Sequence, residues 1–491
     1  MTDSEMQPNP ALTIRFLCLT VALSSALTNL CADDRPSVEL RIPQLKSLPD
    51  VTQTLQQQID AGQGNLKLSG AEYFRITQPL VFNLAAHGAV SVTADEGVTL
   101  IMDGPGPAIR MVGTHNGTAS PKTFEPQTWN QRMPLVSGLE ILGAHPEADG
   151  IELQQTVEPT IRAVAVRECR HGIHLVTRNR NVIISDCHLY NNSGCGVFLD
   201  NVDLHQINVS GCHISYNREG GVVVRDGNVR NLQVSGCDIE GNMPPDETAT
   251  TAANVLIDLT GSADDRTHSV AEVSITGCTI QHAANYSGSE DKTVAPGGAN
   301  IRLAGKALYP IDSVTISGNV LSDTTTTIDL SHVLDVTVTA NSFFAPKPNN
   351  LRVRDSRRVV VTGNTFNPRQ FVRPGIVLFQ NSHDCVISAC TFHALATETG
   401  GLIIDGCSGM ILTALNFSDC GSGIVIQNST GVTISNCRAT RTADNGLSLN
   451  VDAESTDVQL LGNSFGTQVR VSGSAVSGTN QSPAGREALQ Q

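Results

Sequence analysis

Residues 182–189 read VIISDCHL, and this eight-residue pattern recurs along most of the chain. It is recognisable as INVSGCHI at 207–214, LQVSGCDI at 232–239 and VVVTGNTF at 359–366. The first, third and eighth residues of each octet are apolar, and a small corner separates them. Alternating apolar residues on either side of a bend predict two short β-strands and not a helix.

The sixth residue of the octet sets the period of the repeat. Its successive positions lie 22 to 26 residues apart, except for two intervals of 41 residues, which indicate insertions near 241–252 and 282–298. The series runs Leu139, Val164, Cys187, Cys212, Cys237, Cys278, Asn319, Asn341, Asn364, Cys390, Leu415, Cys437 and Asn463.

A second strand of the form Gly-apolar-x-apolar follows each octet, for example GIEL at 150–153 and GIHL at 172–175. Short β units at this period, with no helical pattern between them, predict a solenoid whose coils stack in parallel. A leucine-rich repeat has this period but requires a Leu/Asn consensus that is missing here, and a propeller blade is longer. We therefore predict a right-handed parallel β-helix.

The octets and the Gly-apolar-x-apolar strands resemble the right-handed β-helix repeats of the pectin lyase-like superfamily. The resemblance covers residues 63–471. It implies an all-β solenoid of about 13 or more coils. It also implies that the sheet formed by the second strands is the floor of any substrate cleft.

The first 62 residues differ from the repeat region. An apolar run at 16–27, preceded by Arg15 and followed by small residues, predicts a signal peptide over 1–32. A lipoprotein signal ending at Cys31 is the alternative. Residues 33–62 are expected to form a linker and a short amphipathic helix within 47–62, which would cap the open first coil.

Two further segments do not fit the repeat. Residues 114–132 contain Pro121, Pro126 and Trp129 and are expected to form a loop. Residues 472–491 are small and polar, so we expect a disordered tail.

Charge narrows the range of partners. The formal net charge is −15 and the chain has no basic run, which argues against nucleic acid and anionic membranes as partners. With the signal-peptide pattern, this predicts a secreted, periplasmic or cell-surface protein.

Thirteen cysteines occur, two of them in the predicted signal peptide. Cys187, Cys212, Cys237 and Cys278 share one position on consecutive coils, so a straight row of buried thiols is expected and not a tetrahedral zinc site. Disulfides are expected instead among Cys385, Cys390, Cys407 and Cys420, whose connectivity residue spacing does not assign.

Functional side chains should point outward from the second strands, between the two apolar residues. One polar group combines Asp149 and Glu152 with His171 and His174 on the next coil, and Phe198 follows. The strings ADGIEL and RHGIHL resemble the Asp-Gly-Ile and Gly-His-Gly-Ile elements of polygalacturonases, although Arg170 replaces the first Gly. This resemblance implies that Asp149 is an acid/base carboxylate supported by His171. Solvated turn residues are the alternative interpretation.

A second polar group comprises Arg302, Asp329 and Arg352 on three consecutive coils, with Arg354 and His332 beside it. Two guanidinium groups beside a carboxylate could hold an acidic sugar and assist a lyase reaction. A surface ion-pair ladder is the alternative.

Two classes of function remain open. The chain is either a carbohydrate-active enzyme, a polysaccharide lyase or glycoside hydrolase acting on an acidic polysaccharide, or a non-catalytic exported protein that binds glycan or forms part of a cell surface. No cofactor is predicted, and calcium has no motif to support it.

Overall fold

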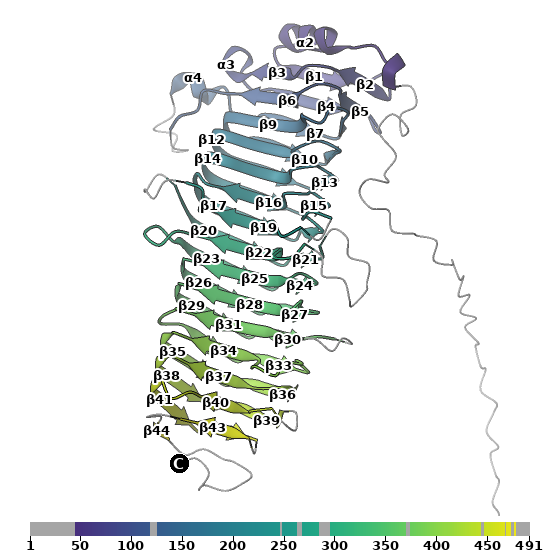
Figure 1. Ribbon diagram of the computed structural model, residues 1–491. Coiled ribbons are helices and arrows are strands. Elements are labelled where there is room, and N and C mark those ends of the chain that lie inside the picture. Colours follow the sequence, from purple (N-terminus) through teal and green to yellow (C-terminus); the bar gives the residue numbers. More distant parts are fainter. Residues whose placement is uncertain are drawn as a thin grey trace, which may run out of the picture.

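The computed structural model describes residues 45–117, 125–245, 248–262, 268–283, 295–369, 374–442, 446–466, 468–472 and 476–477. All paired strands are parallel, and they stack into a solenoid of 15 coils (Figure 1). The predicted all-β solenoid of about 13 or more coils is therefore confirmed. No helix among the described residues is both long and apolar enough to cross a bilayer.

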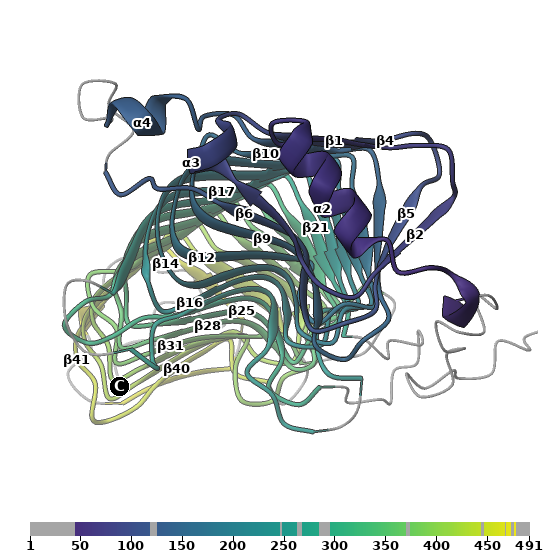
Figure 2. The ribbon, with the colours of Figure 1, turned by 90° about the horizontal axis from the view of Figure 1, so that it is seen from above.

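Each coil crosses three faces, which superpose when the molecule is viewed along its axis (Figure 2). Faces 1 and 3 form one 29-stranded sheet because β12 and β14 bend from face 3 into face 1, and face 2 is a separate 15-stranded sheet.

Face 1 carries the first half of each octet. Its strands are β1 (Asn65–Leu68), β4 (Ser91–Ala94), β7 (Leu135–Ser137), β10 (Thr160–Arg162), the ends of β12 (Ile173–Ser185) and β14 (Cys195–Ser210), β17 (Asn228–Ser235), β20 (Ser269–Thr276), β23 (Ile311–Ser317), β26 (Val333–Thr339), β29 (Arg357–Thr362), β32 (Val386–Ser388), β35 (Ser408–Thr413), β38 (Thr430–Ser435), β41 (Thr456–Leu461) and β44 (Val476–Ser477).

Face 2 carries the end of each octet. Its strands are β2 (Tyr73–Ile76), β5 (Thr99–Met102), β8 (Glu140–Gly143), β11 (Ala165–Arg167), β13 (His188–Tyr190), β15 (His213–Ser215), β18 (Asp238–Glu240), β21 (Thr279–Gln281), β24 (Val320–Ser322), β27 (Ser342–Phe344), β30 (Thr365–Asn367), β33 (Thr391–His393), β36 (Asn416–Cys420), β39 (Arg438–Thr442) and β42 (Ser464–Phe465).

Face 3 carries the Gly-apolar-x-apolar strands. They are β3 (Leu80–Asn83), β6 (Gly106–Val112), β9 (Ala148–Val157), the starts of β12 and β14, β16 (Gly220–Arg225), β19 (Ala253–Asp258), β22 (Ala299–Ala304), β25 (Thr326–Ser331), β28 (Asn349–Arg354), β31 (Ile376–Gln380), β34 (Leu402–Asp405), β37 (Ile424–Gln427), β40 (Leu449–Val451) and β43 (Val469–Val471).

The octet forms its two strands as the alternation predicts. In the first octet Val182, Ile184 and Leu189 are buried in the core, whereas Ile183, between the first two, is 43% exposed. Later coils place phenylalanine at the eighth octet position, and the rings of Phe343, Phe366, Phe392 and Phe417 follow one another at centroid distances of 4.6, 4.8 and 4.2 Å. The core is thus a column of like residues in adjacent coils.

The sixth octet position is a buried polar column. Asn341 accepts hydrogen bonds through Oδ1 from the backbone N–H and side-chain amide of Asn319, and its own amide donates to Ile316 O and Asn364 Oδ1. Cys212 stands at the same position, and the contacts of its thiol to the carbonyls of Ser210 and Ile184 are long, 3.4 and 3.8 Å. Asparagine therefore links its neighbours more strongly than cysteine does.

The eleven cysteines in the described part of the chain are buried free thiols. The row from Cys187 to Cys278 forms as predicted, but the expected pairing among Cys385, Cys390, Cys407 and Cys420 is wrong. Cys385 Sγ accepts a hydrogen bond from Val359 N, and Cys407 Sγ accepts one from Ser382 N, so each thiol contacts the backbone of the preceding coil. Cys390 and Cys420 likewise donate to carbonyls of the preceding coil.

The first coil is closed by α2 (Thr52–Ala61), which lies across the end of the solenoid (Figure 2). Its Leu55 and Ile59 join the main core. The helix lies within the predicted segment 47–62, and Ser47 ends the 3₁₀ turn η2 (Leu45–Ser47) that precedes it. At its start, the Asp50 carboxylate accepts the Thr52 N–H at 2.9 Å.

Two short helices interrupt the coils. They are α3 (Leu84–His87) and α4 (Pro126–Trp129), and α4 lies within the predicted loop 114–132, whose residues 118–124 fall outside the described part. The predicted signal peptide also lies outside the described residues, as does most of the predicted tail, from which β44 is described.

We expect Asn341→Ala to lower the free energy of unfolding by about 2–4 kcal/mol, because it leaves buried donors of Asn319 and the Ile316 carbonyl without partners. Cys212→Ala is the matched control at the equivalent position and should cost about 1 kcal/mol, the cost of losing a small buried group. Denaturant midpoints followed by circular dichroism measure both. Equal losses for the two variants would contradict the asparagine ladder.

Candidate functional site

The outward positions of face 3 form a continuous row. Parallel pairing aligns Glu152 with His174, Phe198, Val223, Leu256, Arg302, Asp329 and Arg352 on successive coils. The rule that the residue between the two apolar positions points outward is therefore correct over these strands. It fails in the next strand, where it would put Val377 outward, because a register shift puts Val377 in the core and aligns Leu378 with Arg352.

The residues in the middle of this row are apolar and shielded from solvent. Phe198, Val223 and Leu256 are nearly inaccessible and form a cluster with Cys195, separate from the main core. The two predicted insertions connect face 2 to face 3 at this height, and their residues Met243 and Ala295 pack together. The covered segment separates two polar groups at either end of the row.

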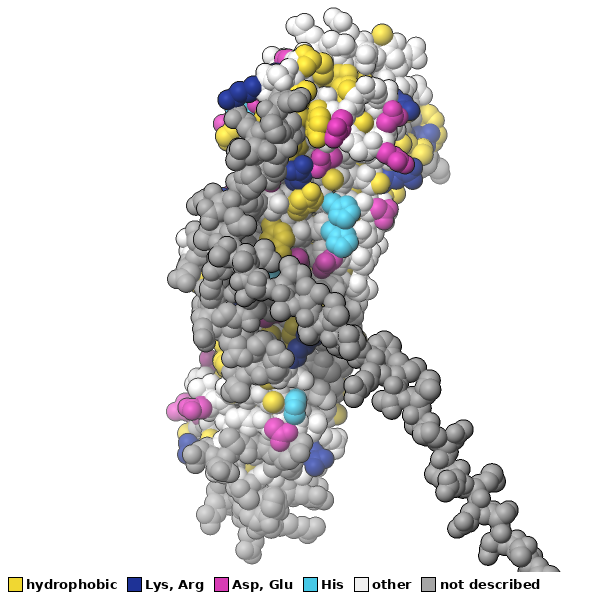
Figure 3. Space-filling view, turned by 90° about the vertical axis from the view of Figure 1, so that its right-hand side faces the viewer, with side chains coloured by type: hydrophobic (Ala, Val, Ile, Leu, Met, Phe, Trp, Pro, Cys, Tyr) yellow, Lys and Arg dark blue, Asp and Glu magenta, His cyan; other side chains and the backbone are white. Residues whose placement is uncertain are grey.

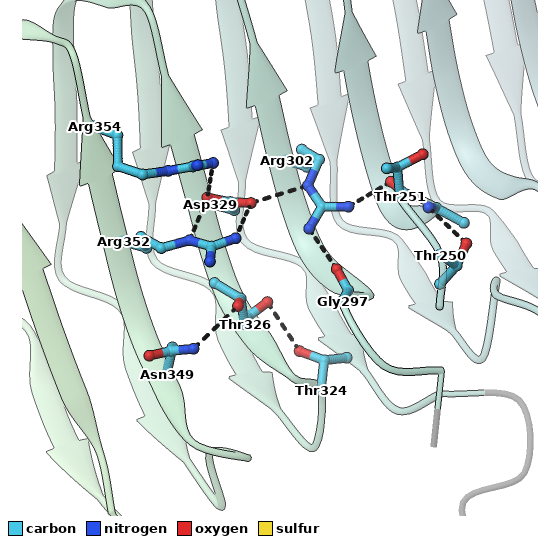
Figure 4. Close-up of polar contacts among 11 residues, drawn as sticks. Thr250, Thr251, Gly297, Arg302, Thr324, Thr326, Asp329, Asn349, Arg352 and Arg354 are labelled. Carbon is cyan, nitrogen blue, oxygen red and sulfur yellow. Dashed lines mark hydrogen bonds and ion pairs between the residues drawn. The ribbon is translucent and has the colours of Figure 1, made fainter. Parts of the chain in front are cut away.

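One of these two groups, which we call the arginine cluster, consists of Arg302, Asp329, Arg352 and Arg354 (Figure 4). Asp329 is 4% exposed and accepts hydrogen bonds from all three arginines. Arg352 binds it through two nitrogens, at 3.0 and 2.8 Å. Because β22, β25 and β28 are adjacent, the register alone brings Arg302, Asp329 and Arg352 together, as the sequence predicted.

The three arginines differ in burial. The Arg302 side chain is 10% exposed and donates to the carbonyls of Thr251 and Gly297, so it ties both loops to the sheet. Arg352 and Arg354 are 30% and 36% exposed. These two arginines are therefore the members of the cluster that a ligand can reach.

The electrostatics of Asp329 follow from this arrangement. Burial would raise the pKa of its carboxyl group, but the Arg352 hydrogen bonds and the charges of the three arginines outweigh it and hold the pKa below its usual value. Asp329 is therefore ionised, and the cluster has three cations around one anion.

The other group, which we call the histidine cluster, consists of Asp149, Glu152, His171, His174, Phe198 and Asp200. His174 Nε2 lies 3.2 Å from Asp200 Oδ2, and its Nδ1 lies 4.0 Å from Glu152 Oε2. The His174 ring stacks on Phe198, with centroids 5.2 Å apart and planes 5° apart. A partly buried imidazole thus lies between two carboxylates.

Asp149 has a different environment from the one expected of a free acid/base group. Its carboxylate accepts two hydrogen bonds from Arg170, at 2.9 and 2.6 Å, and a third from His171 N. The side chain is 2% exposed. Asp149 therefore holds the start of the next strand, and Arg170, which departs from the polygalacturonase pattern, is its partner.

His171 is buried and takes part in the same packing. Its Nδ1 accepts the Cys195 N–H at 3.1 Å, so the neutral ring carries its proton on Nε2. Burial lowers the pKa of His171 to about 4.

Several members of these groups were not predicted. Asp200 lies two residues after Phe198 on the same side of β14, so extending the row at period 2 would have found it. Arg110 binds Glu152 at 2.6 Å from the preceding coil. The loop carbonyls that bind Arg302 carry no sequence signal. His332, predicted beside the arginine cluster, lies one residue beyond β25 at the following corner.

Two protein-family profiles match the chain. The profile described as "Right handed beta helix region" matches residues 136–280. The chain is a right-handed parallel β-helix repeat protein. The resemblance to the pectin lyase-like superfamily is thus confirmed at the level of the fold. A second profile, "Periplasmic copper-binding protein (NosD)", matches residues 272–482.

Several solved structures are similar to this β-helix protein, whereas no curated protein sequence matches it. Tailspike protein 3 of bacteriophage CBA120 has a TM-score of 0.47 and 10% identity over 89% of this chain and 60% of its own length, so this chain spans less than two thirds of it. The DFA-IIIase of Arthrobacter chlorophenolicus A6 has a TM-score of 0.34 and 13% identity over 84% of this chain and 90% of that chain. The A-module of the Azotobacter vinelandii mannuronan C-5 epimerase AlgE4 has a TM-score of 0.34 and 11% identity, covering 89% of this chain and 98% of that one.

The pKa of His171 predicts a pH dependence of stability. A histidine whose pKa is about 4 when folded and 6.5 when unfolded binds more protons in the unfolded β-helix between these values. The neutral His171 ring therefore contributes fully to the free energy of unfolding above pH 6.5. This contribution decreases by up to about 3 kcal/mol as the pH falls through 4. We expect His171→Gln to reduce the slope of stability against pH in this window, measured from denaturant midpoints.

The exposed residue His188 supplies the control, since His188→Gln should leave this slope unchanged. An unaltered slope in the His171 variant would show that burial does not hold this ring neutral.

Proposed function

We propose that this protein binds an acidic polysaccharide on face 3, with Arg352 and Arg354 as the anchor for its carboxylate groups. The observation that carries the proposal is the surplus of charge in the arginine cluster. Three guanidinium groups share the single carboxylate of Asp329, so two positive charges remain uncompensated within the cluster.

The geometry of the cluster supports recognition of carboxylates. A guanidinium group has five N–H donors, and the bonds from Arg352 to Asp329 use two of its nitrogens. Its planar donor pairs match carboxylate oxygens, which a sugar acid presents. Asp329 fixes the position of Arg352 before any ligand binds, so little side-chain entropy is lost on binding.

The charge of the whole chain supports selectivity. A protein with a net charge of −15 repels polyanions in general, so a local cationic site has to provide specific contacts to overcome that repulsion. The same cluster could assist a lyase reaction by stabilising the charge that develops next to a uronate carboxylate. The experiment that measures polysaccharide binding therefore also has to measure cleavage.

Export belongs to the same proposal. The apolar run at 16–27 and the match to a family described as periplasmic support a location outside the cytoplasm, where polysaccharides are encountered.

Copper binding, which the description of the matched family names, finds no support in the donor groups. Among the described residues no group of three or more His, Cys, Asp or Glu side chains is arranged to hold a metal ion. Every described thiol is buried.

We expect the double variant Arg352→Gln, Arg354→Gln to bind polygalacturonate at least about tenfold more weakly than the parent protein, because charge-assisted contacts are lost. The difference should shrink as salt is added. Isothermal titration calorimetry at low and high ionic strength measures both effects. The same samples are assayed for the ultraviolet absorbance of unsaturated uronates.

Arg358→Gln is the matched control, because Arg358 also binds one carboxylate, that of Asp335, through two nitrogens. Its affinity should stay within about twofold of the parent's, since this pair has no surplus charge. Equal binding of a neutral glucan, or parental affinity in the double variant, would overturn the proposal.

A second candidate function is glycoside hydrolysis at the histidine cluster. It is favoured by the placement of His174 between Glu152 and Asp200, since acid/base chemistry needs titratable groups within reach of one another. The members of the cluster lie on coils three to five strand spacings from Arg302, or ~14–24 Å, so the two groups cannot act on one glycosidic bond.

If the protein is a hydrolase, Glu152→Gln and Asp200→Asn should each lower turnover by about 10²- to 10⁴-fold. The double arginine variant should mainly weaken substrate binding. Release of reducing ends from a panel of acidic polysaccharides measures turnover, with Asp335→Asn as a control distant from the cluster. A parent protein that cleaves no polysaccharide of the panel leaves binding as the function.

A further inference from the structure

A cleft lies at the corner where face 3 turns into face 1, beyond the last residues of β22, β25, β28 and β31. Its volume is about 420 Å³, and its polar lining consists of Lys306, His332, Asp355, Arg357, Asn381 and His383. None of these residues belongs to the arginine or the histidine cluster.

The backbone explains part of this lining. His332, Asp355 and Asn381 occupy the same corner of successive coils, with φ values of 50°, 51° and 47°. Asn, Asp and His are the residue types most often found in this left-handed region after glycine, so the corner alone accounts for them. Lys306, Arg357 and His383 have no such backbone requirement. Their presence around one cleft needs another reason.

A longer connection forms one wall of the cleft. Residues 305–310 join β22 to β23, whereas His332 alone joins β25 to β26. Ala307 and Pro310 of this connection contribute an apolar side. Lys306 is 9% exposed, and its Nζ lies 3.2 Å from Ser262 Oγ, so its cationic group has a fixed position.

The lining is rich in cations and hydrogen-bond donors. Lys306 and Arg357 are the basic side chains of the lining, and Asp355 is its single carboxylate, which accepts a hydrogen bond from the Asn381 amide of the next coil at 3.4 Å. His383 uses Nδ1 toward Ser408 Oγ at 2.8 Å. The basic side chains around the cleft therefore outnumber the acidic one.

We propose that this cleft is a second, independent anion site, which takes a molecule of monosaccharide size bearing a carboxylate, phosphate or sulfate group. Its volume is within the range of ~300–1,000 Å³ typical of small-molecule sites. Arg357 and Lys306 supply the charge that pairs with the oxyanion, and the imidazoles and the Asn381 amide supply further hydrogen bonds. The apolar wall of Ala307 and Pro310 faces the remainder of the ligand.

The test uses the full chain and calorimetric titration with three probes: galacturonate, inorganic phosphate and sulfate. The preferred probe distinguishes a carboxylate from a tetrahedral anion. Arg357→Ala should weaken its binding at least about tenfold, because one charge-assisted contact is lost. Arg358→Ala is the matched control and should stay within about twofold, since the neighbouring Arg358 is paired with Asp335 outside the cleft.

Two further variants separate this site from the proposed polysaccharide site. Ala307→Trp, at an exposed loop position, should block the cleft without changing its charge and abolish probe binding. The double variant Arg352→Gln, Arg354→Gln should retain probe affinity within about twofold, whatever it does to polysaccharide binding. Circular dichroism and thermal midpoints check that each variant is folded.

The proposal is overturned if no probe binds the parent protein, or if Arg358→Ala weakens binding as much as Arg357→Ala. It is also overturned if only the double arginine variant loses the probe, because the probe would then bind at the arginine cluster.

Discussion

The structure depends on one constraint: a coil satisfies the hydrogen bonds of its strands only through the coils above and below it. Every strand pairing is parallel and spans about one repeat of the sequence, for example Val209 with Val234 and Val234 with Ile275. Each coil must therefore repeat the corners of its neighbour, and the side chain at a corner faces its equivalent in the next coil. Buried asparagines exploit this directly, since one amide donates to the carbonyl oxygen of the next.

The same constraint determines where polar chemistry can lie on the outside. Outward residues of face 3 stand about one strand spacing apart, ~4.8 Å, so three consecutive coils place Arg302, Asp329 and Arg352 within hydrogen-bonding distance. Face 2, the side toward the viewer in Figure 3, carries acidic and basic side chains interspersed where it is not drawn in grey. His188 and His213 stack there on adjacent strands at 5.0 Å, by the same geometry.

The sequence was informative wherever the interaction follows the repeat. The octet predicted the strands and the buried column, and the outward row predicted which residues of the arginine cluster would meet. It failed where the contacts are not periodic. Phe198, Val223 and Leu256 occupy outward positions as expected, but they are covered at a height where two inserted loops pack together. Residue spacing cannot predict that covering, the carbonyls of Thr251 and Gly297, or the wall that residues 305–310 add to the corner cleft.

Burial separates stabilising from ligand-accessible roles within a single cluster. Arg302 donates to one carboxylate and two loop carbonyls while almost fully covered, so its removal would leave buried acceptors unsatisfied and loosen both loops. Arg352 and Arg354 share the same carboxylate but are about one third exposed. A loss of binding on changing Arg302 would therefore not distinguish a damaged loop from a lost ligand contact. The exposed arginines avoid this ambiguity, because Asp329 retains its bond from Arg302 when they are replaced.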